Sequence, residues 1–143
     1  MLKVVLDTVI FVRALLNPHS FSGRLLFEYL SDYRFFLSPS LIEEILEVLR
    51  RKEIIERFHM RQYNYPQAIS HLIKSMGRAE IIKINKIPAI SRDAKDDKFL
   101  ATAKAAKADY LVSADKDLLD LKVYEDIKII NAEIFLKLLE EQK

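Results

Sequence analysis

Cysteine is absent from the sequence, and glycine and proline are scarce, with two and four occurrences among 143 residues. Without cysteine the chain can form neither a disulfide nor a thiolate metal site, so zinc is not the expected metal. Two glycines cannot build a phosphate-binding loop or a dinucleotide-binding fingerprint. The three histidines are scattered and lack the spacing of metal ligands. Candidate chemistry must therefore be sought among the carboxylates.

A large charge of one sign and a long apolar run are also lacking. The net charge is only +2, so any binding of nucleic acid has to come from local patches rather than from the field of the whole molecule. Lysine, aspartate or arginine interrupts every apolar run well before the ~18 residues that a membrane span needs. The amino-terminal residues lack the pattern of a secretion signal. We expect a cytoplasmic protein with no membrane span.

The residues that are present are typical of a single globular domain. Of all residues 50% are hydrophobic and 31% are charged, and the length suits one domain that comprises residues 1–143. Short apolar runs alternate with stretches of helical periodicity, which predicts an α/β protein with a parallel β-sheet flanked by helices. We expect strands at 2–6, 34–37, 79–84, 110–113 and 127–130, and helices at 11–16, 23–30, 39–52, 54–59, 66–76, 97–106 and 132–140.

Acidic side chains follow several of these strands. Asp7 and Asp115 come at or just after the ends of apolar strands, and Glu44 and Asp97 lie early in helices that follow other strands. Ligands of open parallel sheets collect beyond the carboxyl ends of the strands, so the four acids are expected to meet there. Carboxylates gathered in one cleft repel each other unless a cation neutralises them, and Mg²⁺ and Mn²⁺ prefer oxygen ligands. A metal site is therefore expected.

The acids around residue 97 also have a purely structural interpretation. Aspartate is favoured at helix starts by capping and by the helix dipole, so Asp93, Asp96 and Asp97 are each natural capping residues. Glu43 has the spacing of a capping box, which favours Glu44 as the acid that faces inward. The residues alone therefore favour a capping role for each of the three aspartates.

Three segments carry a family resemblance: VVLDTVIFVRALL, LSPSLIEEILEVLRRKEI and RDAKDDKFLATAKAAKADYLVSADKDLL. With them the chain resembles the PIN domain family, a ribonuclease fold of bacterial and archaeal toxin–antitoxin systems. The resemblance implies a three-layer α/β/α fold with a parallel sheet. It also implies that the catalytic, metal-binding acids of the family fall on Asp7, Glu44, Asp97 and Asp115, and that Thr8, Ser113 and Asp117 support them. The resemblance thus singles out Asp97 as a metal-binding acid and leaves Asp93 and Asp96 as capping or loop residues.

The resemblance further implies a metal-dependent endoribonuclease that hydrolyses RNA phosphodiesters with Mg²⁺ or Mn²⁺. Such a protein would be the toxin of a toxin–antitoxin system, with a small antitoxin covering its site, and would form a homodimer or a larger oligomer. Substrate phosphates would be bound by basic side chains near the acids. The candidates for this role are Arg13, Lys95, Lys98 and Lys116.

Two residues depart from the family's first motif. Val9 stands where asparagine is usual, and it can neither donate nor accept a hydrogen bond. Losing a partner that orients metal ligands lowers affinity or activity about 10–100-fold. Arg13 stands where a small or hydroxyl residue is frequent, and it could pair with a carboxylate or bind a phosphate. These departures motivate an alternative, a catalytically weak or inactive PIN-like module that binds RNA or a protein.

Overall fold

The computed structural model describes residues 1–59, 65–84 and 96–142. Within them, six strands form one sheet in the order β3-β2-β1-β4-β6-β5. Neighbouring strands pair in parallel except for β5 and β6, which are antiparallel. The strands are β1 (Lys3–Leu6), β2 (Arg34–Leu37), β3 (Glu80–Ile81), β4 (Tyr110–Val112), β5 (Val123–Tyr124) and β6 (Ile127–Ile130).

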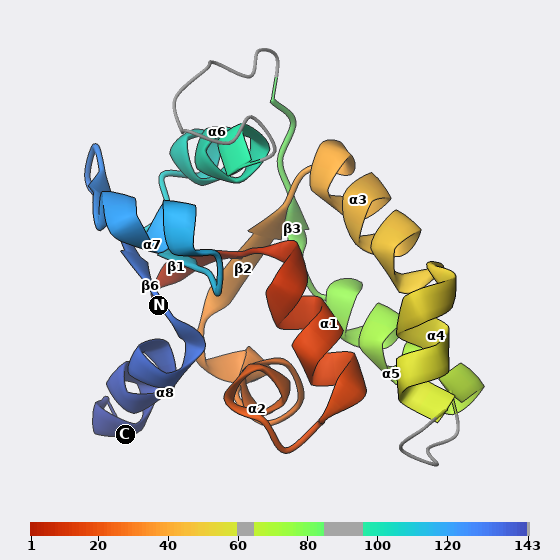
Figure 1. Ribbon diagram of the computed structural model, residues 1–143. Coiled ribbons are helices and arrows are strands. Elements are labelled where there is room, and N and C mark those ends of the chain that lie inside the picture. Colours follow the sequence, from red (N-terminus) through yellow and green to blue (C-terminus); the bar gives the residue numbers. More distant parts are fainter. Residues whose placement is uncertain (60–64, 85–95, 143) are drawn as a thin grey trace.

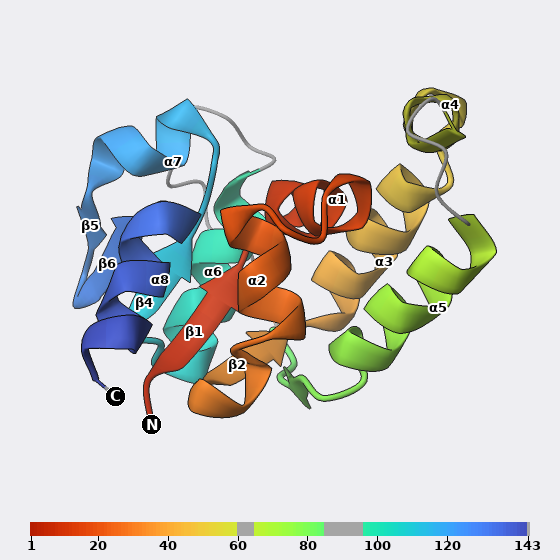
Figure 2. The same ribbon diagram turned by 90° about the horizontal axis from the view of Figure 1, so that it is seen from below.

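Helices cover both faces of the sheet. Helices α6 and α7 lie on one side of it and α2 and α8 on the other (Figure 1), which confirms the predicted α/β class with a sheet flanked by helices. Both views place α3, α4 and α5 together, away from α7 and α8 (Figure 2). The helices are α1 (Thr8–Leu16), α2 (Phe21–Phe27), α3 (Pro39–Leu49), α4 (Lys52–His59), α5 (Tyr65–Met76), α6 (Asp97–Ala106), α7 (Lys116–Leu121) and α8 (Ala132–Glu141), with a 3₁₀ turn, η1, at Leu30–Asp32.

The centre of the sheet is the most deeply buried part of the fold. Val4, Val5 and Leu6 of β1 and Leu111 and Val112 of β4 are fully inaccessible to solvent. Consecutive residues point to opposite faces of a strand, so burial of a whole run requires helices on both sides, as in other parallel sheets. The core thereby holds the ends of β1 and β4 rigidly in place. Among the described residues no helix has the length and apolarity to cross a membrane.

The observed elements differ from the expected ones mainly at strand ends. Helix α1 begins at Thr8 rather than near residue 11, because the Asp7 side chain caps it by accepting a hydrogen bond from the Ile10 N–H. Helix α7 and strand β5 were not expected from the sequence; Asp115 caps α7, accepting hydrogen bonds from two backbone N–H groups. Thus both strand-end aspartates also begin helices.

Gly23 provides a test of the packing between α2 and the turn before it. A Cβ atom added at Gly23 would lie 2.7 Å from the Cα of Pro18 and even closer to the Pro18 carbonyl, which is backbone and cannot move aside. We expect Gly23→Ala to lower the free energy of unfolding by about 1–3 kcal/mol, the usual cost of overpacking. Urea denaturation followed by circular dichroism measures it.

The matched control is Gly77→Ala, the same substitution at the chain's other glycine. There the added Cβ would meet its nearest neighbour, the Lys74 carbonyl oxygen, at 3.3 Å, so the strain is much smaller. Equal losses of stability in the two variants would contradict the close approach at Gly23.

Candidate metal centre

The candidate site lies where the direction of chain connection reverses. Strand β1 has β2 on one side and β4 on the other, so crossovers leave the centre of the sheet in opposite directions. Such a switch point opens a crevice beyond the carboxyl ends of the two central strands. Leu6 pairs with Val112, so the residues that follow them, Asp7 and Ser113, leave the sheet side by side.

Asp7 is held by a network that joins the two strand ends. Its Oδ2 accepts hydrogen bonds from the Ser113 hydroxyl and from the Ala114 N–H, the latter at 3.1 Å, and its Oδ1 accepts one from the Ile10 N–H at 3.2 Å. The Ser113 oxygen in turn accepts a hydrogen bond from the Asp115 N–H at 2.9 Å. Ser113 therefore connects the first acid to the backbone of the fourth.

The charge of Asp7 is unfavourable in this position. The side chain is buried, with 2% of the residue exposed, and burial raises the pKa of its carboxyl above the ordinary value of 3.8. Hydrogen bonds from Ser113, Ile10 and Ala114 lower this pKa, and the nearby charge of Asp115 raises it. A carboxylate in this situation gains most from a cation placed beside it.

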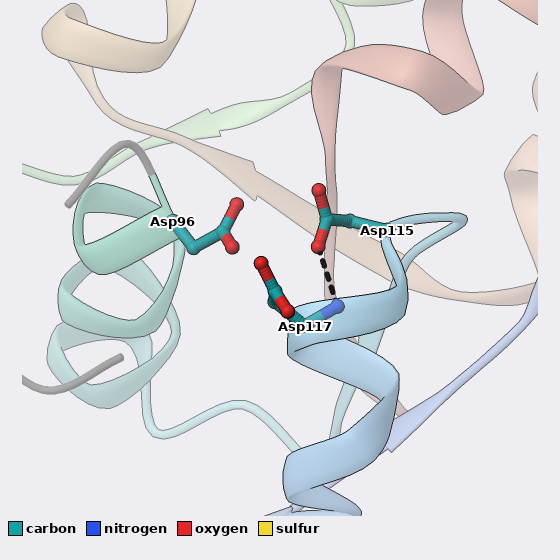
Figure 3. Close-up of side chains that lie close together, drawn as sticks. All are labelled: Asp96, Asp115 and Asp117. Carbon is teal, nitrogen blue, oxygen red and sulfur yellow. Dashed lines mark hydrogen bonds between the residues drawn. The ribbon is translucent and has the colours of Figure 1, made fainter. Parts of the chain in front are cut away.

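Three further carboxylates converge next to Asp7. Asp96, Asp115 and Asp117 each offer an oxygen atom, and these atoms all lie within 4.8 Å of one another. Asp96 comes from the start of α6 and the other two from the start of α7, and Figure 3 shows their carboxylates pointing toward one another. Asp115 is fixed by a hydrogen bond of 2.8 Å from the Asp117 N–H.

This donor set fits a hard divalent cation. It consists of carboxylate oxygens alone, the ligands that Mg²⁺ and Mn²⁺ prefer, and the chain has no thiolate that would favour zinc. Asp117, which the resemblance suggested as a supporting residue, belongs to the convergent group itself. The group can therefore hold a metal ion.

The positions of Asp96 and Asp97 differ from the sequence interpretation. Asp96 makes no capping hydrogen bond to α6 and joins the acidic group with Asp115 and Asp117, whereas Asp97 is buried at the first residue of α6 and is not one of these three. Neighbouring residues at a helix start point in different directions, so the two aspartates have different surroundings. The sequence contains both aspartates and does not reveal which one joins the group; Asp93 lies outside the described residues.

Glu44 approaches the site from α3. Its Oε2 accepts a hydrogen bond from the Thr8 hydroxyl, and its Oε1 lies 2.9 Å from the Lys98 ammonium. Thr8 therefore positions Glu44, one of the acids that it was expected to support. Lys98, a candidate for phosphate binding, is engaged with Glu44.

A cavity of about 770 Å³ contains most of these groups. Its acids include Asp7, Glu44, Asp96 and Asp115, and its basic residues include Arg51 and Arg57. Arg57 was not recognised as a site residue in the sequence, because its position depends on how α4 is placed after α3. The remaining lining residues are Thr8, Val9, Val12, Ser40, Glu43, Glu47, Val48, Ile54, Lys98 and Phe99.

The other basic candidates lie elsewhere. Arg13 lines a second cavity of about 290 Å³, which shares no lining residue with the first. Lys116 is exposed at the start of α7 and is not part of the acidic cavity's lining. Lys95 lies outside the described residues. Val9, in contrast, does line the acidic cavity and is 39% exposed there, so an apolar side chain stands beside the acids.

A sheet of mostly parallel strands with carboxylates gathered at its switch point defines a class of α/β proteins suited to binding divalent metal. The profile of the PIN domain matches residues 3–117, most of the chain. The chain belongs to the PIN domain family, which confirms the resemblance seen in the sequence. PIN domains are generally metal-dependent nucleases, so the family supports a hydrolase.

The chain is also similar to individual proteins. An uncharacterized protein of Methanocaldococcus jannaschii, MJ1680, is 31% identical over 126 residues, which cover 85% of this chain and 76% of that protein. The crystal structure of PAE2754 from Pyrobaculum aerophilum matches with a TM-score of 0.64 at 14% identity, over 99% of this chain and 91% of the other. VapBC2 from Rickettsia felis, bound to a DNA fragment from its promoter, matches with a TM-score of 0.57 at 19% identity, over 90% and 98%.

Asp7 predicts an unusual dependence of stability on pH. Because its pKa is raised in the folded state, its contribution to stability is fully present below pH 3.8 and is lost as the pH rises through the folded-state pKa. Asp7→Asn removes the buried charge; the asparagine oxygen can keep the bonds from Ser113 and Ala114, and only the Ile10 N–H loses its side-chain acceptor. We expect this variant to unfold at higher urea concentration than the wild type at pH 7 in EDTA, with the difference vanishing toward pH 3.8.

Asp126→Asn is the control for Asp7→Asn, since Asp126 is exposed in the turn between β5 and β6 and is not part of the acidic group. It should leave the dependence of stability on pH unchanged. An Asp7→Asn protein that is less stable than the wild type at pH 7 would show that the charged form is favoured by the fold.

Asp96→Asn and Asp97→Asn distinguish the two neighbouring acids. We expect Asp96→Asn to weaken Mn²⁺ binding roughly tenfold or more, because even partners that only support a metal ligand contribute 10–100-fold to affinity. Asp97→Asn should bind Mn²⁺ much as the wild type does, since Asp97 is not one of the three convergent carboxylates. Calorimetric titration with Mn²⁺ measures both. If Asp97→Asn weakened Mn²⁺ binding more than Asp96→Asn did, Asp97 would be the metal-binding acid, as the sequence predicted.

Proposed function

We propose that this protein is a metal-dependent endoribonuclease and the toxin of a toxin–antitoxin system. The observation that carries the proposal is the convergence of Asp96, Asp115 and Asp117, the first two of which line a cavity together with the buried Asp7 and two arginines. Membership of the PIN domain family supports a nuclease, and the likeness to VapBC2 supports the assignment to a toxin–antitoxin system.

In this proposal Asp96, Asp115 and Asp117 hold Mg²⁺ or Mn²⁺, with Asp7 and Glu44 at its side. A bound divalent ion would lower the pKa of a water molecule and stabilise the charge that develops on the phosphodiester. The chain's own part is to orient: Ser113 holds Asp7 toward the centre, and the Asp117 N–H fixes the Asp115 carboxylate. A carboxylate at the edge of the group would take a proton from the attacking water.

RNA is the proposed substrate because the cavity combines acids with basic residues on one open wall. Arg51 is held by two hydrogen bonds to Glu47, with its side chain about half exposed, and Arg57 is exposed nearby. Guanidinium groups at such positions bind backbone phosphates without reading sequence. They would place a phosphodiester over the acids.

The antitoxin is proposed to occupy the same cavity. Beside the acids, the wall carries the apolar side chains of Val9, Val12, Val48, Ile54 and Phe99, which suit a peptide better than a nucleic acid. A basic side chain of the partner could pair with the carboxylates, as the sequence resemblance implies. A homodimer or larger oligomer and a cytoplasmic location stay predictions from the sequence.

The second candidate function is a PIN-like module that binds RNA or a protein without cleaving. Val9 favours it, since it stands in the cavity wall where an amide would help to orient the carboxylates. Arg13, the other departure from the family pattern, does not line the acidic cavity. It is therefore no argument against metal binding.

Cleavage of RNA with and without Mn²⁺ separates the two functions. We expect Mn²⁺-dependent endonucleolytic cleavage of a labelled single-stranded RNA by the wild type. Asp7→Asn and Asp115→Asn should each reduce the rate about a hundredfold or more, because loss of a metal ligand removes several kcal/mol of transition-state stabilisation. Gel electrophoresis of the products measures the rates.

Asp126→Asn serves again as the matched control, since it makes the same chemical change on an exposed turn and should leave the rate unchanged. The opposite outcome is that the wild type and both acid variants bind RNA equally, without metal, and do not cleave it. That outcome would contradict the nuclease proposal and support the binding module.

A further inference from the structure

Both carboxylate oxygens of Glu44 are engaged by groups of the chain itself. The Thr8 hydroxyl donates to Oε2, and the Lys98 ammonium lies 2.9 Å from Oε1. The lysine and glutamate side chains are only 24% and 21% exposed, and both residues line the acidic cavity. An acid that the family pattern assigns to metal is therefore already neutralised by a cation.

This ion pair is unlike the others on α6. Lys104, on the same helix, pairs with Glu125 at 3.2 Å, but there the side chains are 55% and 51% exposed. Exposed pairs of that kind contribute little, whereas a pair largely withdrawn from water is screened less. Lys98 is thus held at Glu44 more firmly than a surface lysine would be.

Residues at the start of α6 contribute opposite charges to the acidic group and to Glu44. Asp96 contributes its carboxylate to the group with Asp115 and Asp117, and Lys98, two residues later, contributes its ammonium to Glu44. The described cavity wall carries the acids Asp7, Glu43, Glu44, Glu47, Asp96 and Asp115 and only the cations Arg51, Arg57 and Lys98. Arg51 is paired with Glu47, and Lys98 is paired with Glu44, the acid that the family pattern assigns to metal.

We propose that the Lys98 ammonium occupies the place of a second divalent ion and limits the site to one metal. A second ion would need carboxylates on the α3 side of the cavity, where Glu43, Glu44 and Glu47 lie. Arg51 pairs with Glu47, and Lys98 both occupies Glu44 and repels another cation. The proposal rests on the proposed function, since it requires the acids to bind metal. It specifies how many ions they bind.

Counting bound Mn²⁺ tests this directly. The full chain is titrated with Mn²⁺, and the free ion is measured by electron paramagnetic resonance. We expect the wild type to bind one ion and Lys98→Met to bind two, because the variant releases Glu44 and removes the repelling charge. Lys98→Gln is a second neutral replacement, so that a packing defect in one variant does not decide the result. The urea midpoint of each protein verifies that it is folded.

Three variants serve as controls. Lys98→Arg keeps the charge and should still bind one ion. Lys104→Met makes the same replacement in the exposed pair on α6 and should also bind one. Combining Lys98→Met with Glu44→Gln removes the ligand of the second ion and should return the count from two to one.

The outcomes separate this inference from the proposed function. One bound ion in both neutral variants, or two in the wild type, would overturn the role of Lys98 while leaving a metal site intact. No bound Mn²⁺ in any protein would contradict the metal site and the inference together. A change from one ion to two without cleavage of RNA would support the inference and contradict only the nuclease.

Discussion

The pairing of β1 with β4 is the interaction on which the candidate site depends. Its register sets Leu6 against Val112, so that Asp7 and Ser113 leave the sheet together and Ser113 can bond both to Asp7 and to the Asp115 backbone. A slip of one residue would turn every side chain of the strand to the opposite face. The fully buried apolar residues of both strands prevent such a slip, so the hydrophobic core determines the geometry of the acids.

The same geometry brings carboxylates that repel one another close together inside the fold. The raised pKa of Asp7 means that folding forces a carboxylate into surroundings that disfavour its charge. Ser113 and Lys98 relieve part of the unfavourable energy, one through a hydrogen bond to Asp7 and the other through an ion pair with Glu44. Proteins commonly accept such local instability at sites that bind cations, because the bound cation then restores the lost stability.

Much of the fold could be predicted from the sequence, because buried strands and capped helices leave strong local patterns. The residues of β2, α6 and β6 were expected where they occur, and Asp7 and Asp115 were placed correctly at strand ends. The roles of Asp96 and Asp97 could not be separated, since the rotation of a helix about its axis is decided by tertiary packing. Neither the role of Arg57 nor strand β5 was predicted. The position of each depends on tertiary packing, and neither has a local signal in the sequence.

The edges of the sheet limit how this protein can assemble. The outermost strands, β3 and β5, are each two residues long, and Arg34 and Glu80 form an ion pair beside the β3 edge. Edges so short and charged give an approaching strand few hydrogen bonds to form. We therefore expect another subunit or a peptide to bind through side chains on the helices or in the cavity. Mutations of these side chains can change which partner is bound while leaving the sheet intact.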